Sequence, residues 1–483
     1  MSFINKKGLV LVLCLILAIS AFTGCSNKKT DSEVTKSEVE NQTNEVAQEE
    51  KKQEAPVKIF ASITGGKDPE EHELWVKAFS EASGVDIEMQ KFEGNEYSEK
   101  VAAAIAAGDD YDVFYLNADD FEKFFKMGVF EPITSYIEES EVLSDPSIID
   151  PKEWDRIRRV DGEIYAVFTK YEGGRLPLVR GDWLQKLNIK PPTTLDGYYE
   201  MLKAFTTMDP DGNGKDDTYG FTMKKTYDIQ PFMSTQGLVP GFAYDDNHKL
   251  YYPWASDKAA VIYDWLAKLY KEGILDPNIA TNSSSNCREL IFSSRAGMFT
   301  YWDAWAGQFN EIARGDDPNT IFEMKGIAPP LDENGNAILT AGQDGLFVIN
   351  RNSKNKDFAF KALEFLHTQE GNMLTTLGIE GHDYTVENTE YKLTEIGQGH
   401  GMNHGSMTPK SLKWKNPLGE AMGTPEAREV VLKYAKPEML TQHSKGAKDI
   451  VDKYAMKAIM GEISGEEAVK AMQKEMKAEN MID

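Results

Sequence analysis

Residues 57–116 read VKIFASITGGKDPEEHELWVKAFSEASGVDIEMQKFEGNEYSEKVAAAIAAGDDYDVFYL, and this stretch decides the fold. Its apolar opening, Val57–Ile63, is predicted to be a buried strand. A helix is predicted next, because Asp68 supplies an N-cap, Pro69 suits the first helical position and Gly84 supplies a stop. One face of that helix is apolar and consists of Leu74, Trp75, Ala78 and Phe79. The stretch therefore opens as a strand followed by an amphipathic helix.

The same alternation continues along this stretch. Val85–Met89 alternates as a second strand, Ser98–Ala107 is predicted as a helix, and Asp112–Leu116 is a third apolar strand. A strand-helix-strand-helix-strand order predicts a parallel sheet with right-handed crossovers, and hence an α/β fold. Ligands of such sheets bind beyond the carboxyl ends of the strands, which here are the loops Ser62–Asp68 and Asn117–Asp120.

The N-terminal residues have the pattern of a secretory signal. Lys6 and Lys7 precede an uncharged apolar run that is too short to span a bilayer. Thr23 and Gly24, directly before Cys25, resemble a bacterial lipobox, in which the cysteine is acylated and becomes the new N-terminus. The sequence therefore predicts a lipoprotein signal peptide at residues 1–24 and a lipid anchor on Cys25. An ordinary signal peptide with an incidental cysteine is the alternative.

Residues 25–56 contain no aromatic side chain and consist mostly of Glu, Lys, Ser, Thr, Asn and Gln. Such a segment cannot bury enough apolar surface to offset the entropy lost on ordering, so we expect a disordered tether. The anchor and the tether together place the folded body at the extracytoplasmic face of the cell membrane.

Composition excludes several classes of function. Loss of residues 1–24 removes two of the 53 basic residues and none of the 78 acidic ones, so the formal charge changes from −25 to −27. That acidity argues against nucleic acid as a partner. Lipidation of Cys25 leaves Cys287 without a partner, so no disulfide framework is expected, and Cys287 has no nearby histidine to activate it. The signatures G-x-S-x-G, the P-loop and G-x-G-x-x-G are absent.

Four stretches, in order along the chain, resemble the extracellular solute-binding proteins, the lipoprotein receptors of bacterial ABC sugar importers. LPLVRGDWLQKLNIKPPTTLDGYYEMLKAF (Leu176–Phe205) resembles that family's region from an arginine and an aspartate-tryptophan-leucine to a proline-threonine-threonine. MGVFEPITSYIEES (Met127–Ser140), GMFTYWDAW (Gly297–Trp305) and GIEGHDYTV (Gly378–Val386) are similar to three further family stretches. The last is typical of the larger lipoprotein members. The alginate-binding members resemble this chain at Asp209–Phe221.

The resemblance implies a periplasmic-binding-protein-like fold, in which two α/β lobes are joined by a hinge and a central cleft holds the ligand. One lobe would take residues 57–168 and 325–375, and the other residues 169–324 and 376–483. It further implies a receptor rather than an enzyme. This receptor captures a carbohydrate, with an oligosaccharide preferred, and as a monomer delivers it to ABC permease subunits. A surface glycoside hydrolase, or a receptor for peptides or other solutes, remains the alternative.

Aromatic rings cover the apolar faces of sugars, and Asp, Asn and Arg bind their hydroxyls. Trp302, Asp303 and Trp305 supply both kinds of side chain at the expected exit of a strand, although either tryptophan could instead belong to the core. The remaining candidate ligand-binding residues lie near expected crossings or strand ends: Tyr171, Arg175, Asp119, Asn117, Trp414 and Asp344. For Arg175 a surface ion pair is the alternative, and for Asn117 and Asp119 it is capping of the next helix.

Oxygen-bearing residues recur at every second position of DPDGNGKDDTYGF (Asp209–Phe221). The spacing matches a calcium loop with a glycine at its sixth position. The predicted ligands of a structural calcium ion are Asp209, Asp211, Asn213, the backbone carbonyl of Lys215, and Asp217. The twelfth position is Gly220, where a full EF-hand loop has a bidentate Glu. A plain surface turn is the alternative.

GHGMNHGSM (Gly399–Met407) contains His400 and His404, which are spaced as metal ligands would be on a helix. Its glycines favour a loop, and no third ligand is identifiable, so we interpret the segment as a plain loop.

Overall fold

The computed structural model describes residues 52–62, 69–92, 96–400 and 410–483. The predictions for the signal peptide, for Cys25 and for the tether up to residue 51 lie outside these residues. So do those for most of the Ser62–Asp68 loop and for the segment after His400. The described helices and strands belong to the compact unit Gln53–Asp483. Across the described ranges, no helix combines the length and the apolar character that a bilayer crossing needs.

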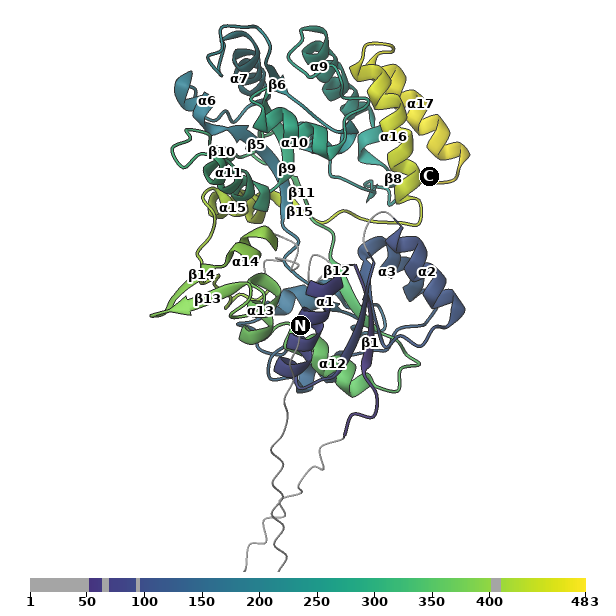
Figure 1. The fold of residues 1–483 in the computed structure, drawn as a ribbon. Helices are drawn as coiled ribbons and strands as arrows, with labels where there is room; N and C mark the ends of the chain where they lie inside the picture. Colours follow the sequence, from purple (N-terminus) through teal and green to yellow (C-terminus); the bar gives the residue numbers. More distant parts are fainter. Residues whose placement is uncertain (1–51, 63–68, 93–95, 401–409) are drawn as a thin grey trace, which may run out of the picture. The chain divides into compact units, whose positions relative to one another are not determined.

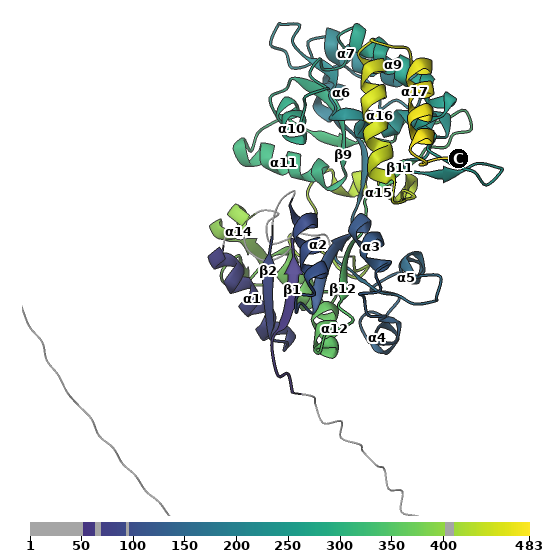
Figure 2. The ribbon, with the colours of Figure 1, turned by 90° about the vertical axis from the view of Figure 1, so that its right-hand side faces the viewer.

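The first sheet has five strands in the order β2-β1-β3-β12-β4, of which Figure 1 labels β1 and β12. β1 (Val57–Ala61) pairs in parallel with both β2 (Ile87–Lys91) and β3 (Val113–Asn117), which confirms the predicted parallel arrangement. α1 (Pro69–Ser83) and α2 (Tyr97–Ala107) connect these strands. Figure 2 shows α1 beside β2.

Two strands from later in the chain complete this sheet. β12 (Gly345–Ile349) runs antiparallel to β3, and β4 (Val167–Phe168) runs antiparallel to β12, so the sheet is mixed. The other helices whose buried side chains join the core of this sheet are α3 (Ala118–Phe125), α4 (Thr134–Glu139), α5 (Pro151–Ile157), α12 (Lys356–Phe365) and α13 (Gln369–Thr376). Trp75 and Phe79 of the predicted apolar face are fully buried, and Phe79 meets Phe365 edge-on at 5.0 Å between ring centroids.

The second sheet has the order β15-β11-β5-β9-β6, with β10 also paired to β5. Its central strand β5 (Gly174–Arg180) is buried along its whole length and runs antiparallel to β9 (Ala296–Trp302). The shorter strands are β6 (Tyr219–Phe221), β10 (Met324–Gly326), β11 (Leu339–Ala341) and β15 (Ala435–Lys436). The helices are α6 (Gly181–Lys186), α7 (Leu195–Thr207), α8 (Gln230–Met233), α9 (Ala260–Lys271), α10 (Ser284–Phe292), α11 (Ala304–Asp316), α15 (Thr424–Tyr434), α16 (Ser444–Ile459) and α17 (Gly465–Ala478).

The remaining elements are short. Single turns of 3-10 helix are η1 (Lys225–Ile229), η2 (Ser234–Gln236), η3 (Pro253–Ala255) and η4 (Asp257–Ala259). Two hairpins are formed by β7 (Ala243–Tyr244) with β8 (Leu250–Tyr251) and by β13 (Tyr384–Glu387) with β14 (Glu390–Leu393), and α14 (Glu395–His400) follows the second hairpin.

Within the residues that the structure describes, the chain passes between the two sheets at three places. The first crossing, Thr169–Gly173, joins β4 to β5. The second is Gly342–Asp344, because β10 and β11 still pair with β5 and the first sheet resumes at β12. Strand pairing thus places this crossing later than the expected residue 325. β10 and β11 have only three residues each, too few for a periodic pattern to show which sheet they join.

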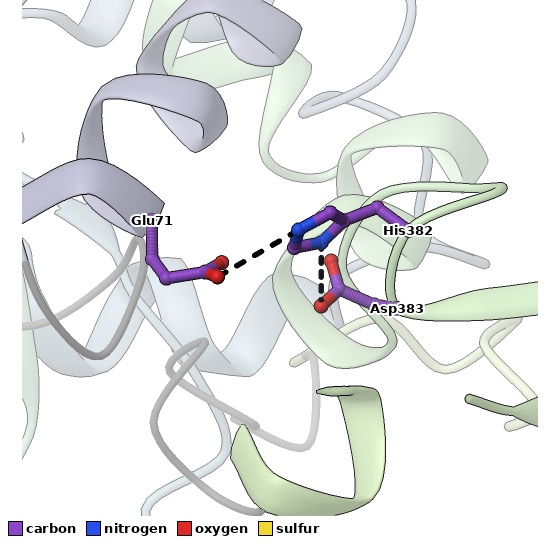
Figure 3. A group of neighbouring side chains, drawn as sticks. All are labelled: Glu71, His382 and Asp383. Atoms are coloured by element: carbon purple, nitrogen blue, oxygen red, sulfur yellow. Dashed lines mark hydrogen bonds and ion pairs between the residues drawn. The ribbon is translucent and has the colours of Figure 1, made fainter. Parts of the chain in front are cut away.

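The segment after α13 contacts elements of the first sheet, whereas the resemblance had implied that it belongs to the second lobe. His382 lies beside Glu71 of α1 (Figure 3), and Lys413 forms an ion pair with Asp145 at 2.6 Å. The third crossing therefore falls between Lys413 and the start of α15. We propose these crossings as the boundaries between the lobes.

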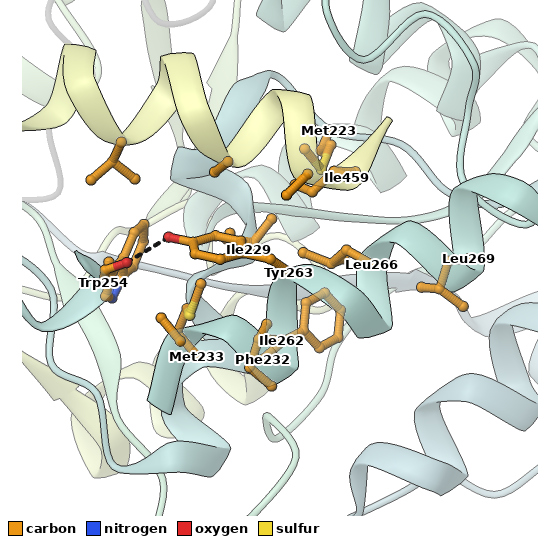
Figure 4. Packing of buried hydrophobic residues seen from close by; sticks show 14 of the residues in the cluster. Met223, Ile229, Phe232, Met233, Trp254, Ile262, Tyr263, Leu266, Leu269 and Ile459 are labelled. Carbon is orange, nitrogen blue, oxygen red and sulfur yellow. Dashed lines mark hydrogen bonds between the residues drawn. The ribbon is translucent and has the colours of Figure 1, made fainter. Parts of the chain in front are cut away.

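Helices α9, α16 and α17 pack together over the second sheet and close its larger core. Figure 4 shows this packing around Tyr263, which is fully buried and donates its hydroxyl to the carbonyl of Trp254 at 2.7 Å. Phe232 and Leu266 are also fully buried there. Each such side chain contributes roughly 1.5–3 kcal/mol by burial, so the C-terminal helices are an integral part of this lobe.

Candidate ligand-binding site

Four of the predicted ligand-binding residues come together where the first crossing enters the second sheet. In the antiparallel pair of β5 and β9, Arg175 lies opposite Trp302. Asp303 follows β9 directly, and its N–H donates to the carbonyl of Gly174 at 3.0 Å. Tyr171 is on the crossing itself. The start of one strand and the end of its antiparallel neighbour necessarily lie at one edge of the sheet, which explains why residues so distant in sequence meet.

Asp303 is buried at this edge, with 3% of its surface exposed. Burial raises the pKa of its carboxyl group, while N–H donors from Gly174 and Ala304 and the charge of Arg428 oppose the rise. Gly173 has a φ of 65°, and a Cβ there would clash with the Asp303 carboxylate. The glycine is therefore needed both for its backbone conformation and for the close approach of Asp303.

The Tyr171 hydroxyl is buried beside the Asp303 carboxylate, but it makes no hydrogen bond of full length and angle to a described residue. Its pKa is raised, first by burial and then by the nearby Asp303 carboxylate. The guanidinium carbon of Arg428, from α15, is 5.7 Å from the centroid of the Tyr171 ring, and Arg428 pairs with Glu420. A buried hydroxyl without a partner costs roughly 1–3 kcal/mol, so this position has an unmet need for a polar partner.

Arg175 forms a buried ion pair with Asp228, not the surface pair that was the alternative. Its guanidinium also donates to the carbonyl of Thr300 at 2.6 Å. The rings of Tyr227 and Trp302 flank it at 4.7 and 5.4 Å from its central carbon. Burial raises the pKa of Asp228 and the charge of Arg175 opposes that rise. Both of these hydrogen bonds come from Nη2, whereas Nε of Arg175 is buried without a partner among the described residues.

Trp302 and Trp305 are both partly buried, so neither is wholly a core residue. Trp305 meets Tyr301 edge-on at 5.3 Å between ring centroids, and the guanidinium carbon of Arg288 is 4.9 Å from its ring. Trp302 ends β9 and Trp305 lies in the first turn of α11, so both stand at the exit of a strand as the sequence predicts.

Asp344, on the second crossing, is part of an ionic network. Its carboxylate pairs with Arg156 of α5 and lies 3.7 Å from the Lys410 ammonium, and Glu153 contacts both of these cations. Glu172, which sequence analysis did not single out, accepts a hydrogen bond from the Gly345 N–H at 2.9 Å. Its pKa is raised by burial and lowered less strongly by Lys170.

Asn117 and Asp119 occupy the first turn region of α3. Asn117 is the N-cap, and its side chain accepts from the Asp120 N–H at 2.8 Å, as the capping alternative proposed. Asp119 is exposed and lies within electrostatic range of Lys448 from α16. Lys448 also sits 3.9 Å from the centroid of Tyr227 and was not found from the sequence. Trp414 is partly buried at the start of the segment that contains the third crossing.

The loop that was predicted to bind calcium is closed by its own hydrogen bonds. The two carboxylate oxygens of Asp209 accept from the N–H groups of Gly212 and Gly214, at 3.0 and 3.1 Å. The Asn213 side chain donates to Asp211 at 2.7 Å and to Asp217 at 3.1 Å. The Asn213 amide nitrogen thus bridges Asp211 and Asp217, whereas the three carboxylates do not gather within 4.8 Å of one another. The oxygen-rich residue types are those that a hard cation prefers.

The twelfth position of this loop cannot carry a side chain. Gly220 lies in β6, and a Cβ there would clash with the Leu202 carbonyl of α7. The missing bidentate Glu therefore follows from the packing of strand against helix. Lys186 donates to the carbonyls of Asp209 and Pro210, at 3.1 and 2.9 Å, and so ties the loop to α6.

The sequence has measurable similarity to known proteins. Residues 75–381 match the family of bacterial extracellular solute-binding proteins. Lipoprotein LipO of Bacillus subtilis is 24% identical over 399 residues, which cover 78% of this chain and 73% of LipO. The polygalacturonan/rhamnogalacturonan-binding protein YtcQ of the same organism is 26% identical over 268 residues, which cover 54% of this chain and 52% of YtcQ.

Solved structures share the fold. The alginate-binding protein AlgQ2 without calcium superposes with a TM-score of 0.62 at 20% identity, over 87% of this chain and 94% of that one. An EF-hand mutant of the substrate-binding protein FusA of Streptococcus pneumoniae, in complex with fructo-nystose, gives 0.61 at 16% identity, over 88% and 96%. Two sheets, each packed with helices and joined by several crossings, are the architecture of the two-lobed binding proteins. The chain belongs to the family of bacterial extracellular solute-binding proteins.

Proposed function

We propose that this protein is the extracytoplasmic receptor of an ABC importer and that its ligand is a carbohydrate, preferably an oligosaccharide. The observation that carries this proposal is the Tyr171 hydroxyl, buried beside the Asp303 carboxylate without a hydrogen bond of full length and angle. A sugar hydroxyl can both donate to Asp303 and accept from Tyr171. The names of YtcQ, AlgQ2 and FusA, which refer to polygalacturonan/rhamnogalacturonan, alginate and fructooligosaccharide, support the same ligand class.

Each residue of the site has a proposed role. Trp302 and Trp305 cover apolar sugar faces, for which their partly exposed rings are suited. Asp303 accepts from sugar hydroxyls, and Arg175 holds the edge of the site through Asp228. Asp119 and Trp414 remain candidates from the other side of the crossings. Asn117 and Asp344 are weaker candidates for sugar binding, because Asn117 already caps a helix and Asp344 already belongs to an ionic network.

Transport requires that the ligand prefer the closed arrangement of the lobes. A ligand that binds both arrangements equally shifts no population, however tightly it binds. Residues on the crossings, such as Tyr171, contact a ligand and the moving backbone at once, so they suit this task. The closed form would dock on the permease as a monomer, held at the membrane by the lipid on Cys25.

The loop at residues 209–217 is proposed to bind a structural calcium ion through the five predicted ligands. AlgQ2 and FusA are named in connection with calcium and an EF-hand. Without a bidentate twelfth ligand, one or more waters complete the six to eight oxygens that calcium takes. The ion would fix the loop between α7 and β6.

A thermal-shift screen of the full chain tests both proposals. It compares mono- and oligosaccharides, including uronates, each with calcium and with chelator. A ligand of the folded state raises the melting temperature by mass action. The expected result is a shift for one sugar class, with the sugar recovered intact. Cleaved products would establish the glycoside hydrolase instead, and shifts with peptides alone would move the ligand to another class.

A further inference from the structure

A second group of metal-ligating side chains lies apart from the loop at residues 209–217. Glu71 belongs to the first turn of α1, whereas His382 and Asp383 lie in the loop between α13 and β13 (Figure 3). His382 Nε2 is 3.6 Å from Glu71 Oε1, and His382 Nδ1 is 3.2 Å from Asp383 Oδ1. One ligand atom from each residue can be chosen so that all three lie within 4.8 Å of one another.

We propose that Glu71, His382 and Asp383 bind a divalent transition-metal ion, zinc being the best fit. Zinc ligands lie about 2.0–2.2 Å from the ion in a tetrahedron, which puts them roughly 3.3–3.6 Å from each other. A histidine binds one ion through one ring nitrogen, so only one of the two separations counts: 3.2 Å to Asp383 if Nδ1 is the ligand, or 3.6 Å to Glu71 if Nε2 is. Either distance is close to the tetrahedral spacing, and one ligand atom from each residue can be chosen within 4.8 Å of the other two. Glu71 has a flexible side chain, so its carboxylate can complete the set with a change of rotamer. Water would occupy the fourth position.

The loop holds its two ligands in place through backbone contacts. Asp383 is fully buried, and its Oδ2 accepts from the Ile379 N–H at 2.7 Å. Thr394 donates its hydroxyl to the carbonyl of His382 at 2.6 Å. Gly378 has a φ of 93°, and a Cβ there would clash with the Asp383 carboxylate. Ligands fixed in this way lose little entropy on binding a metal, which favours a preformed site.

The donor set selects among metals. Calcium and magnesium prefer oxygen ligands alone, whereas imidazole nitrogen suits zinc and its first-row neighbours. Two carboxylates with a neutral imidazole carry a charge of −2, which a divalent cation neutralises. The ion would link α1 to the segment after α13, and so would stabilise the first-sheet lobe without touching the sugar site.

Zinc titration of the metal-free full chain by calorimetry, after chelation and dialysis, tests the proposal. The variants are His382→Gln and Glu71→Gln, which keep size and polarity. The controls are His248→Asn, at an exposed position with a φ of 59° that Asn tolerates, and Asp211→Ala in the calcium loop. One zinc per chain is expected, with a rise in melting temperature of about 3 °C at 100 times Kd. Both variants should lose at least tenfold in affinity, and neither control should.

Cobalt gives a readout that does not depend on stability. Co²⁺ bound through His382 should show visible ligand-field absorption that is lost in His382→Gln and kept in Glu71→Gln at reduced affinity. Zinc binding that persists unchanged in His382→Gln would overturn the proposal. Binding that is lost only in His404→Gln would also overturn it and assign the metal to the glycine-rich segment. Sugar binding is measured separately, so failure here leaves the receptor proposal standing.

Discussion

Replacement of Tyr171 by Phe should make the ligand-free protein more stable and the receptor weaker. The Tyr171 hydroxyl is buried beside the Asp303 carboxylate without a hydrogen bond of full length and angle to a described residue, so its removal relieves a desolvation penalty. The same hydroxyl is the proposed donor to the sugar. A residue that serves only the fold would not give opposite changes in stability and affinity, so the signs of the two effects test its role directly.

The magnitudes follow from the burial of this group. An unsatisfied buried hydroxyl costs roughly 1–3 kcal/mol, which Tyr171→Phe would recover in the ligand-free state. For a body of roughly 430 residues the unfolding entropy is about 0.9 kcal/mol per degree, so the melting temperature should rise by about 1–3 °C. Loss of one hydrogen bond to the sugar, worth about 1–2 kcal/mol, should weaken binding by roughly 5- to 30-fold.

The assay pairs a melting curve without sugar with calorimetric titration of the sugar that the screen identifies. Tyr97→Phe is the matched control, because the Tyr97 hydroxyl is also buried but donates to the Tyr115 carbonyl at 2.7 Å. That variant should lose about 1 kcal/mol of stability and keep its affinity. If Tyr171→Phe instead melts lower and binds sugar as the parent does, the hydroxyl is structural and the site has been placed wrongly.

Three further outcomes are expected. Asp211→Ala should abolish the calcium-dependent rise in melting temperature yet leave the chelator-treated protein within about 0.5 kcal/mol of the parent; a retained rise would place the ion elsewhere. Trp305→Ala should lower sugar affinity about 30-fold by isothermal titration, or about 2 kcal/mol, and an unchanged affinity would return this ring to the core. Burial lowers the pKa of His367 to about 4, so the unfolded chain binds more protons between pH 6.5 and 4 and stability falls as pH drops through that window. Urea unfolding should show that the free energy of unfolding falls by up to about 3 kcal/mol over this pH range, and that this fall is absent in His367→Gln. An equal fall in that variant would assign the pH dependence to other groups.

Local signals made the first sheet predictable. The strands and helices between Val57 and Leu116 each carry a clear period, and Gly108 ends α2 in the left-handed conformation that favours glycine. β11 gave no such signal, because a three-residue strand has no readable period and its pairing with β5 depends on contacts made far along the chain. The same reason applies to the crossing at Gly342–Asp344.

The candidate site was predictable only in part. Trp302 and Asp303 could be found because chemistry and position coincide in five consecutive residues. Arg428 and Lys448 could not, since each stands on a helix whose sequence reads as an ordinary charged face. His382 belongs to the GIEGHDYTV stretch, but its proximity to Glu71 exists only after α1 and the loop before β13 have packed on the same sheet.

The crossings also limit where the receptor can bend. Asp344 and Lys410 are tied to α5 by ion pairs, so the residues on either side of them move with the first sheet. Gly342 instead donates its N–H to the Gly173 carbonyl at 2.9 Å, and Asp303 holds Gly174, so these residues move with the second sheet. Bending must then occur within one or two residues around Glu172 and Gln343. We therefore expect sugar to slow amide hydrogen exchange at residues 169–173 and 342–345 and to leave α16 unaffected. Equal slowing throughout the second sheet would mean that the sugar stabilises the fold as a whole and does not select a closed hinge.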